Sequence, residues 1–285
     1  MSTAGRYVEC RDGLRLWVED EGQGPATLLL HGFTGSGATL QGLVNGLSST
    51  RRFVRPDLLG HGASDAPADP AAYRIERCLA RLEDILDHLE VETCDVIGYS
   101  MGGRVGLSLS VALPERVRSL VLIGASPGLA KASDREARRL ADDAWAEGLL
   151  SRGLEWFVAE WMALPLFATQ SRLGEAALSE MQRQRLSCRA EGLAGSLRGL
   201  GTGSMPPLHE ALSELKQPVF LIAGAEDEKF SGIAKEMERS ILNAERFEVP
   251  GAGHAPHLER PSFLKPMLCR FLDRVSPVQG NGESR

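Results

Sequence analysis

The segment that decides the fold runs from residue 95 to residue 107 and reads DVIGYSMGGRVGL. A short apolar run is followed by the pattern Gly98-Tyr99-Ser100-Met101-Gly102, and a helical pattern begins at once. With 31 glycines in the chain, a GxSxG match alone carries little weight. A strand, a glycine-flanked serine and a helix in direct succession are, however, the arrangement of a nucleophile elbow. The segment therefore predicts a nucleophilic Ser100, and an idle serine in a glycine-rich turn is the alternative.

Short apolar runs alternate with helical patterns on both sides of this segment. Two runs joined through Asp12-Gly13, Tyr7–Cys10 and Arg15–Glu19, predict an antiparallel hairpin. The other runs are typical of strands buried on both faces of a parallel sheet: Thr27–Leu30, Phe53–Arg55, Asp95–Ile97, Ser119–Ile123, Val219–Ala223 and Arg246–Val249. The helical patterns lie around Ala38–Leu47, Arg74–Leu89, Gly102–Val111, Ile233–Ile241 and Phe263–Val275. The alternation predicts an α/β fold, a mostly parallel sheet flanked by helices.

The alternation stops between Ser126 and Pro218, where the sequence is helical and charged. Because this segment is too long for a loop, it predicts a helical cap inserted between two sheet strands. We expect a core made of residues 1–126 and 206–275, a cap at residues 127–205, and a disordered tail at residues 276–285.

Two further loops are expected at the sheet edge that carries Ser100. His254 ends a glycine-rich loop after the last apolar run, and Asp227 follows the run before it. The chain order serine, acid, histidine is that of a catalytic triad on this kind of sheet. The sequence therefore predicts Ser100, Asp227 and His254 as the triad, with Glu226 or Glu228 as the alternative acid.

The run Leu28-Leu29-Leu30 ends in His31-Gly32-Phe33 at the same edge. The loop that follows is placed to present the backbone N–H of Phe33 opposite that of Met101. Two N–H donors aimed at one point are what a developing oxyanion needs. We expect an oxyanion hole here, and a plain turn is the alternative.

Composition limits the classes of function. The 285 residues are 43% hydrophobic and 25% charged, as in an ordinary globular protein, and the net charge of −6 argues against nucleic-acid binding. The first 20 residues are polar, and the most apolar stretch, Val96 to Leu113, is crossed by Arg104, so no membrane insertion is expected. The 5 scattered cysteines suit a reducing cytoplasm.

The remaining histidines and the search for cofactor motifs add little. His61 is expected to shape a loop, His257 is a lesser candidate for a substrate contact, and His88 and His209 are expected on the surface. No His or Cys cluster has the spacing of metal ligands, and no GxGxxG follows a strand. Neither a metal nor a nucleotide cofactor is therefore indicated.

Several motifs together are similar to one family of enzymes. They are HGFTGS, RPDLLGHGASDAP, GYSMGGRVGL, GASPGL, WFVAEWMALPLF, GLAGSLRGLGTG, EDEKF and PGAGHAPHLE. Between about Ala26 and Leu272 the chain resembles 2-succinyl-6-hydroxy-2,4-cyclohexadiene-1-carboxylate (SHCHC) synthases, lyases of menaquinone biosynthesis with the α/β-hydrolase fold. HGF, GxSxGG and GxGH identify only the superfamily, whereas GYSMGGR, ASPGL, the cap tryptophan and the late GTG are more discriminating.

The resemblance implies a reaction and a set of residues. Family enzymes use the triad without water: a proton is removed from the substrate, and pyruvate leaves as the ring gains a double bond. The family's catalytic serine, acid and histidine fall on Ser100, Asp227 and His254. Its substrate-contacting side chains fall on Tyr99, Arg104, Arg138, Trp161 and Arg189. Arg135 and Arg139 lie beside Arg138, so the cap residue that faces the substrate is left open.

One feature of the residues agrees with this implication. Arg104 lies one helical turn past Ser100, where a neutral ester would have no use for a charge. A guanidinium pairs with a carboxylate in a bidentate manner, and the family substrate carries three carboxylates. Internal salt bridges, or a general preference of the chain for arginine, are the alternative for Arg104, Arg138 and Arg189.

The sequence thus predicts a lyase that acts on a small polycarboxylate in the cytoplasm. A hydrolase that cleaves an ester or a carbon–carbon bond of a carboxylated molecule with the same triad is the first alternative. A binding module with an idle triad is the second, and the intact elbow, acid and histidine argue against it. The sequence does not indicate the oligomeric state.

Overall fold

The computed structural model describes residues 5–45, 47 and 50–277. Its strands form one eight-stranded sheet in the order β1-β2-β4-β3-β5-β6-β7-β8. The strands are β1 (Arg6–Glu9), β2 (Arg15–Gly22), β3 (Ala26–Leu30), β4 (Arg52–Pro56), β5 (Cys94–Tyr99), β6 (Val117–Ile123), β7 (Val219–Gly224) and β8 (Ala244–Val249). The predicted hairpin is confirmed, because β1 and β2 pair antiparallel, and β2 also pairs antiparallel with β4. From β4 to β8 every pair is parallel, which confirms the α/β fold class.

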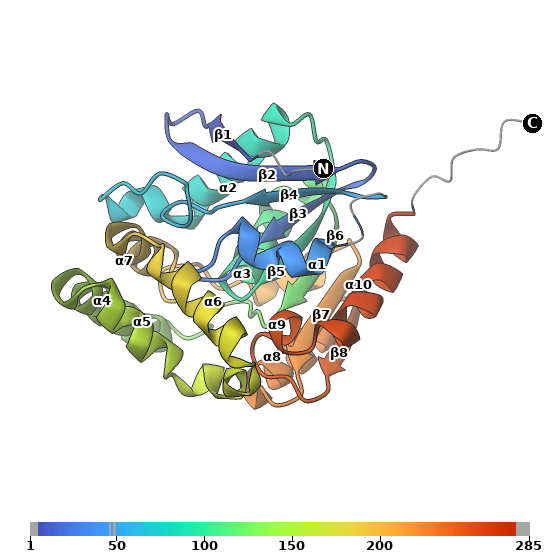
Figure 1. Cartoon of the computed structure of the whole chain (residues 1–285). Coiled ribbons are helices and arrows are strands. Elements are labelled where there is room, and N and C mark those ends of the chain that lie inside the picture. The colour runs from blue at the N-terminus through green and yellow to red at the C-terminus, as the bar shows by residue number, and fades with distance from the viewer. Residues whose placement is uncertain (1–4, 46, 48–49, 278–285) are drawn as a thin grey trace, which may run out of the picture.

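The helices cover both faces of this sheet (Figure 1). They are α1 (Gln41–Val44), α2 (Ile75–His88), α3 (Met101–Ala112), α4 (Ala132–Arg152), α5 (Leu154–Met162), α6 (Glu175–Leu186), α7 (Ala190–Leu200), α8 (Glu228–Ser240), α9 (Pro256–Glu259) and α10 (Pro261–Val275). The pattern around Ala38–Leu47 forms a 3₁₀ turn, Gly37–Leu40, followed by the short α1. Helix α8 begins five residues before the expected Ile233, because Asp227 caps its first turn.

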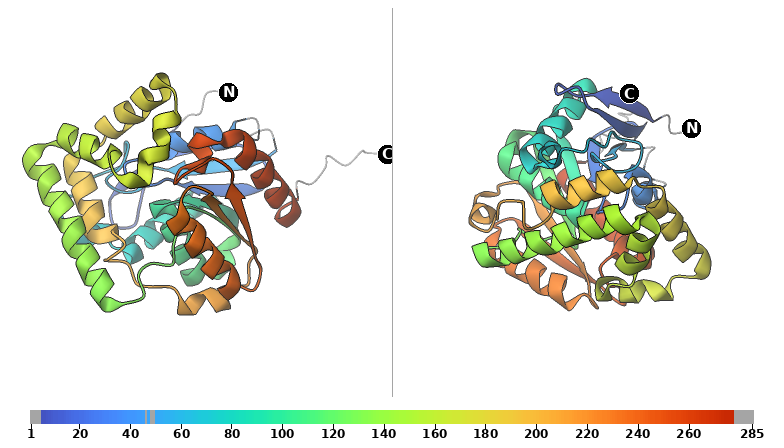
Figure 2. Two further views of the ribbon diagram at one scale, coloured as in Figure 1. Left: turned by 90° about the horizontal axis from the view of Figure 1, so that it is seen from below. Right: turned by 90° about the vertical axis from the view of Figure 1, so that its left-hand side faces the viewer.

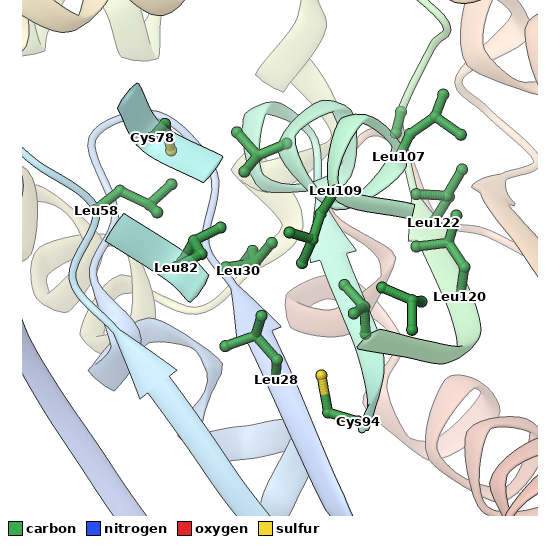
Figure 3. Packing of buried hydrophobic residues seen from close by; sticks show 14 of the residues in the cluster. Leu28, Leu30, Leu58, Cys78, Leu82, Cys94, Leu107, Leu109, Leu120 and Leu122 are labelled. Carbon is green, nitrogen blue, oxygen red and sulfur yellow. The ribbon is translucent and has the colours of Figure 1, made fainter. Parts of the chain in front are cut away.

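The central strands are apolar throughout because each contributes to two cores. In β3, Leu28 and Leu30 pack toward α2, α3 and α8, whereas Leu29 packs toward α1 and α10. Successive side chains of a strand point to opposite faces, so a strand with helices on both sides must be apolar at every position. Figure 3 shows the first core, where Leu82 of α2 and Leu109 of α3 lie over these strands.

The segment between β6 and β7 is helical, as expected, and contains α4 to α7 and a 3₁₀ turn at Pro165–Arg172. Figure 2 shows these helices, green to yellow, gathered at one end of the molecule. They have a hydrophobic core of their own that includes Leu149 of α4, Phe157 of α5 and Leu193 of α7. The cap limits 127–205 stay a prediction.

Two expectations concern the surface and the C-terminus. In the described part of the chain, no helix is both long and apolar enough to cross a membrane. Most of the tail that we expect to be disordered, residues 278–285, lies outside the described residues. Of the residues before it, Ser276 is buried, and its carbonyl oxygen accepts a hydrogen bond from Arg51.

Candidate active site

Ser100 occupies the sharp turn between β5 and α3. Its φ of +51° lies in a region that residues with a side chain rarely adopt, and its N–H donates to the Ile123 carbonyl at 2.8 Å. The turn requires Gly102, because a Cβ there would lie 2.1 Å from the Leu30 carbonyl oxygen. The adjacent strands therefore hold the serine at the carboxyl edge of the sheet, as the elbow pattern predicts.

His254 and Asp227 complete a chain of hydrogen bonds that ends at this serine. His254 Nε2 lies 3.0 Å from Ser100 Oγ, and its Nδ1 lies 2.8 Å from Asp227 Oδ2. Both partners of the second bond are buried. Asp227 is also the N-cap of α8, where its Oδ1 accepts from the Phe230 N–H at 3.2 Å. A carboxylate at a helix N-terminus is favoured by the free N–H groups there.

The structure does not bring the alternative acids to His254. Glu226 forms a two-pronged ion pair with Arg172, with both N···O distances at 2.7 Å, and its side chain is exposed. Glu228 is exposed at the start of α8. Asp227 is therefore the carboxylate that can orient the imidazole.

The loop after β3 lies at this site, and His31 fixes part of its backbone. His31 Nδ1 lies 2.8 Å from the Gly32 carbonyl oxygen, and its Nε2 accepts from the Leu58 N–H at 2.9 Å. The C=O and N–H of a trans peptide point in opposite directions, so the bond to Gly32 turns the Phe33 N–H away from His31. Met101 is the first residue of α3, where N–H groups lack partners within the helix. Both residues line one cavity with Ser100, and their oxyanion role stays a prediction.

This cavity has a volume of about 730 Å³ and lies between the sheet edge and the cap helices. Four of the five side chains predicted to contact substrate line it: Tyr99, Arg104, Arg138 and Trp161. Trp161 stacks on Phe157 and meets the Phe33 ring edge-on, with centroids 5.1 Å apart. An aromatic wall therefore reaches from the cap to the predicted oxyanion loop.

Arg189 is the exception among the five side chains predicted to contact substrate. It precedes α7, its side chain is exposed, and it does not line the cavity. Arg185, near the end of α6, lines the cavity instead and lies over the Phe167 ring at 5.8 Å. The QRQRLSCR stretch turns sharply between α6 and α7, and a helical period cannot be continued across such a turn.

Arg138 is the one member of its cluster that faces the cavity. Arg135 donates to the carbonyl groups of Leu129 and Ala130, and Arg139 pairs with Glu136 on the same helix. The structure thus shows which of these three arginines lines the cavity, a choice that the sequence leaves open.

The charge of Arg104 has no partner within ion-pair distance among the described residues. Its Nε is buried and makes no hydrogen bond in that part of the chain. Burial, and then the positive charge of Arg138, lower the pKa of Arg104 to about 10, while Asp142 opposes this shift. The group remains cationic at neutral pH and faces the cavity one turn past the serine. A half-buried charge without a partner in a cavity favours an anionic ligand.

Arg185 resembles Arg104 in the burial of its Nε and in its lowered pKa. Its Nε is also buried without a hydrogen-bond partner in the described residues, and burial lowers its pKa. Lys229 of α8 lines the cavity as well. Apart from the triad, the lining carries two carboxylates, Asp142 and Glu180, against four cationic side chains: Arg104, Arg138, Arg185 and Lys229. The cavity is therefore net positive although the whole chain is net negative.

The other histidines fall where the sequence indicates. His61 is fully buried against the rings of His31 and Phe33, and burial lowers its pKa to about 3, as suits a residue that shapes a loop. His257 is buried too, lines the cavity, and lies 4.3 Å from the Tyr99 ring between centroids. Its pKa is about 3, chiefly because of burial. His88 and His209 are exposed.

Sequence reasoning missed Arg185, Lys229 and Asp142 as lining residues. Lys229 had a usable signal, because it is the second residue after Asp227 at the start of a capped helix. Asp142 lies one turn past Arg138, a spacing at which opposite charges meet on a helix. Among the residues that the structure describes, no group of three or more His, Cys, Asp or Glu side chains is arranged to hold a metal ion.

Comparisons with known proteins agree with this geometry. Residues 25–261 match the alpha/beta hydrolase fold family. A Bacillus subtilis protein that provisionally carries the name SHCHC synthase is 40% identical over 270 residues, which cover 94% of this chain and 98% of that protein. An Enterobacter SHCHC synthase is 29% identical, over 87% of this chain and 92% of its own length.

Solved structures extend the comparison. MenH from S. aureus superposes with a TM-score of 0.87 at 32% identity, covering 90% of this chain and 98% of that one. A thermophilic esterase from Thermogutta terrifontis has a TM-score of 0.83 at 24% identity, covering 96% and 99%, which concerns the fold alone. The chain therefore belongs to the alpha/beta hydrolase fold family and, within it, to the 2-succinyl-6-hydroxy-2,4-cyclohexadiene-1-carboxylate synthases.

Proposed function

We propose that this protein eliminates pyruvate from 2-succinyl-5-enolpyruvyl-6-hydroxy-3-cyclohexene-1-carboxylate and releases SHCHC, a step of menaquinone biosynthesis. The observation that carries the proposal is the unpaired guanidinium of Arg104, which shares the cavity of the Ser100–His254–Asp227 chain. The kinship with SHCHC synthases supports the same substrate.

The positive cavity matches the charge of that substrate. Three carboxylates require several cations, and Arg104, Arg138 and Arg185 line the cavity on different elements, α3, α4 and α6. A guanidinium binds a carboxylate through two parallel N–H donors, so each pair fixes orientation as well as charge. We infer that these arginines place the acidic carbon of the substrate above Ser100.

The triad then removes a proton rather than attacking a carbonyl. Ser100, whose hydroxyl lies against His254 Nε2, takes the proton adjacent to the succinyl ketone, and His254 takes the serine proton in turn. Asp227 stabilises the resulting imidazolium through Nδ1. The N–H groups of Phe33 and Met101 hold the enolate oxygen that develops.

Elimination follows without a covalent intermediate. The electron pair of the broken C–H bond forms a ring double bond between C2 and C3, the existing double bond moves from C3–C4 to C4–C5, and the C–O bond between C5 and the enolpyruvyl group breaks. The leaving enolate takes up a proton, for which the imidazolium of His254 is the source, and becomes pyruvate. No water is consumed, so a cap that covers the site removes competing hydrolysis.

We propose further that residues 127–205 act as the cap, that the ligand is a small polycarboxylate, and that the enzyme works in the cytoplasm. Trp161, Arg138 and Arg185 all come from the cap segment, so this segment supplies both an aromatic wall and two of the charges. The core supplies the triad and Arg104.

Oxygen-18 water separates this reaction from hydrolysis by the same triad. A lyase releases pyruvate from the precursor while its ring product gains no label beyond background carboxylate exchange, and it turns over neutral esters slowly and without a burst. A hydrolase acts through an acyl-enzyme that water splits. Fast ester turnover with a burst, and no diene from the precursor, would replace the lyase with a hydrolase.

A further inference from the structure

Asp142 is a buried carboxylate in the cavity wall that the proposed reaction does not use. It lies on α4 one helical turn past Arg138, and only 4% of the residue is exposed. Its Oδ1 accepts a hydrogen bond from Arg138 Nε at 2.8 Å. A carboxylate beside a site that binds anions opposes binding unless it performs a task that outweighs this repulsion.

The second oxygen of Asp142 is not available to a ligand. Oδ2 is buried and has no hydrogen-bond partner among the described residues. It lies against the backbone of Gly201, where a Cβ would come within 2.5 Å of it. The contact through which Asp142 can help a ligand bind is therefore the one that its Oδ1 makes with Arg138.

Because Asp142 accepts a hydrogen bond from Nε of Arg138, the two terminal amino groups of Arg138 remain available to a ligand. A guanidinium has five N–H donors in a planar fork, and the two terminal amino groups are those that bind a carboxylate in parallel. In the described residues Arg138 makes its hydrogen bond through Nε, and its side chain is 40% exposed. Because this hydrogen bond already orders the long side chain, ligand binding loses less side-chain conformational entropy.

Asp142 also compensates charge on this wall. Arg104 and Arg138 line the same cavity and repel each other, which contributes to the lowered pKa of Arg104. The carboxylate of Asp142 opposes this shift. Burial in turn raises the pKa of Asp142, while both arginines favour its ionised form.

We propose that Asp142 is a positioning residue: it holds Arg138 by Nε so that the two terminal amino groups face the cavity ready for a substrate carboxylate. The inference rests on the proposed function, because the ligand is the polycarboxylate substrate. Burial works against the charge of Asp142, so the contribution of this residue lies in its hydrogen-bond acceptor, which serves binding.

Two substitutions separate the acceptor of Asp142 from its charge. Asp142→Ala removes the acceptor, so KM for the precursor should rise about 5- to 30-fold while kcat changes by less than about threefold. Asp142→Asn keeps an acceptor for Nε but loses the charge, so KM should stay near that of the wild type. The matched control is Asp143→Asn, since Asp143 is exposed on the same helix and pairs with Arg198.

A double-mutant cycle tests whether Asp142 acts through Arg138. Once Arg138 is replaced by Ala, the further change Asp142→Ala should not raise KM again, because the group that it positions is gone. Independent, multiplying effects of the two substitutions would overturn the proposal, and so would an unchanged KM in Asp142→Ala. Should that variant fail to fold, Asp142→Leu fills a similar volume without an acceptor and takes its place in the cycle.

Calorimetry with propane-1,2,3-tricarboxylate measures binding alone, so this test does not depend on the proposed reaction. The Kd of this probe should rise in Asp142→Ala and remain unchanged in Asp143→Asn. If the wild type binds the probe in this pattern but releases no pyruvate from the precursor, the proposed function fails and the role of Asp142 stands. If Asp142→Ala binds the probe as tightly as the wild type, the role of Asp142 fails and the proposed function is untouched.

Discussion

Arg104 lies one turn past Ser100 on α3, and its backbone N–H donates to the Ser100 carbonyl at 3.1 Å. The same helix therefore fixes both the nucleophile and one cation of the cavity. Because the elbow backbone determines where Ser100 Oγ lies, it also determines how far a carboxylate held by Arg104 lies from the reacting atom. A ligand carboxylate that pairs with Arg104 is therefore held at a set distance from Ser100.

Replacing Arg104 by Ala should lower kcat/KM about ten- to a hundredfold, because one charge-assisted contact is lost. Arg104→Lys should recover only part of this, since an ammonium lacks the planar fork. Steady-state kinetics with the precursor measure both. Wild-type turnover in Arg104→Ala would make the residue structural.

Ser100→Ala, Asp227→Asn and His254→Ala should each reduce kcat about a thousandfold or more, because the hydrogen-bond chain acts as a unit. Combined substitutions should lose little beyond the single ones. Circular dichroism and thermal melts serve as controls for folding. Near-normal activity in Ser100→Ala would remove the serine from the mechanism.

Arg185→Ala should raise KM about tenfold or more, whereas Arg189→Ala should leave it within about twofold, because only Arg185 lines the cavity. The pair is well matched, since both are arginines four residues apart in the same stretch. The opposite ranking in steady-state kinetics would contradict the arrangement of α6 and α7 described above.

The difference between these two arginines also shows what the sequence could and could not predict. Ser100, Asp227 and His254 follow strands, and parallel strands bring their carboxyl ends to one edge, so the pattern alone places them together. Arg185 and Asp142 lie on helices of the cap, whose orientation depends on how the helices pack against one another. Charged, weakly periodic helices such as α6 do not reveal which side faces inward.

Stability should fall in mild acid. Burial lowers the pKa of His61 and of His257 to about 3 and also lowers that of His31, whereas the unfolded value is near 6.5. Between these values the unfolded chain binds protons that the folded chain does not. The stabilisation is therefore fully present above about pH 6.5 and is lost as the pH falls toward 3.

Urea denaturation between pH 7.5 and 5 measures this loss. Each such histidine contributes a slope of up to about 1.4 kcal/mol per pH unit below its unfolded pKa. His61→Asn should reduce the slope of the unfolding free energy against pH by the contribution of one histidine. His88→Asn, at an exposed position, should leave this slope unchanged. Equal slopes in wild type and His61→Asn would show that His61 is protonated in the folded state.

Gly102→Ala should destabilise the fold by about 3 kcal/mol or more, because its Cβ would meet the Leu30 carbonyl oxygen, a backbone atom that cannot move aside. Gly232→Ala in α8 is the control. A Cβ there meets nothing within 4 Å, so it should stabilise by about 0.5–1 kcal/mol. Chemical denaturation compares the two, and a neutral Gly102→Ala would contradict the close approach of α3 to β3.

The stoichiometry of the reaction tests the central claim most directly. The purified protein is given 2-succinyl-5-enolpyruvyl-6-hydroxy-3-cyclohexene-1-carboxylate, and pyruvate and the ring diene are followed together, with an enzyme-free sample and Ser100→Ala alongside. We predict that pyruvate and diene appear one-for-one, far faster than in either control. Pyruvate release no faster than in the enzyme-free sample, or pyruvate without the diene, would contradict the assignment of this site as a lyase.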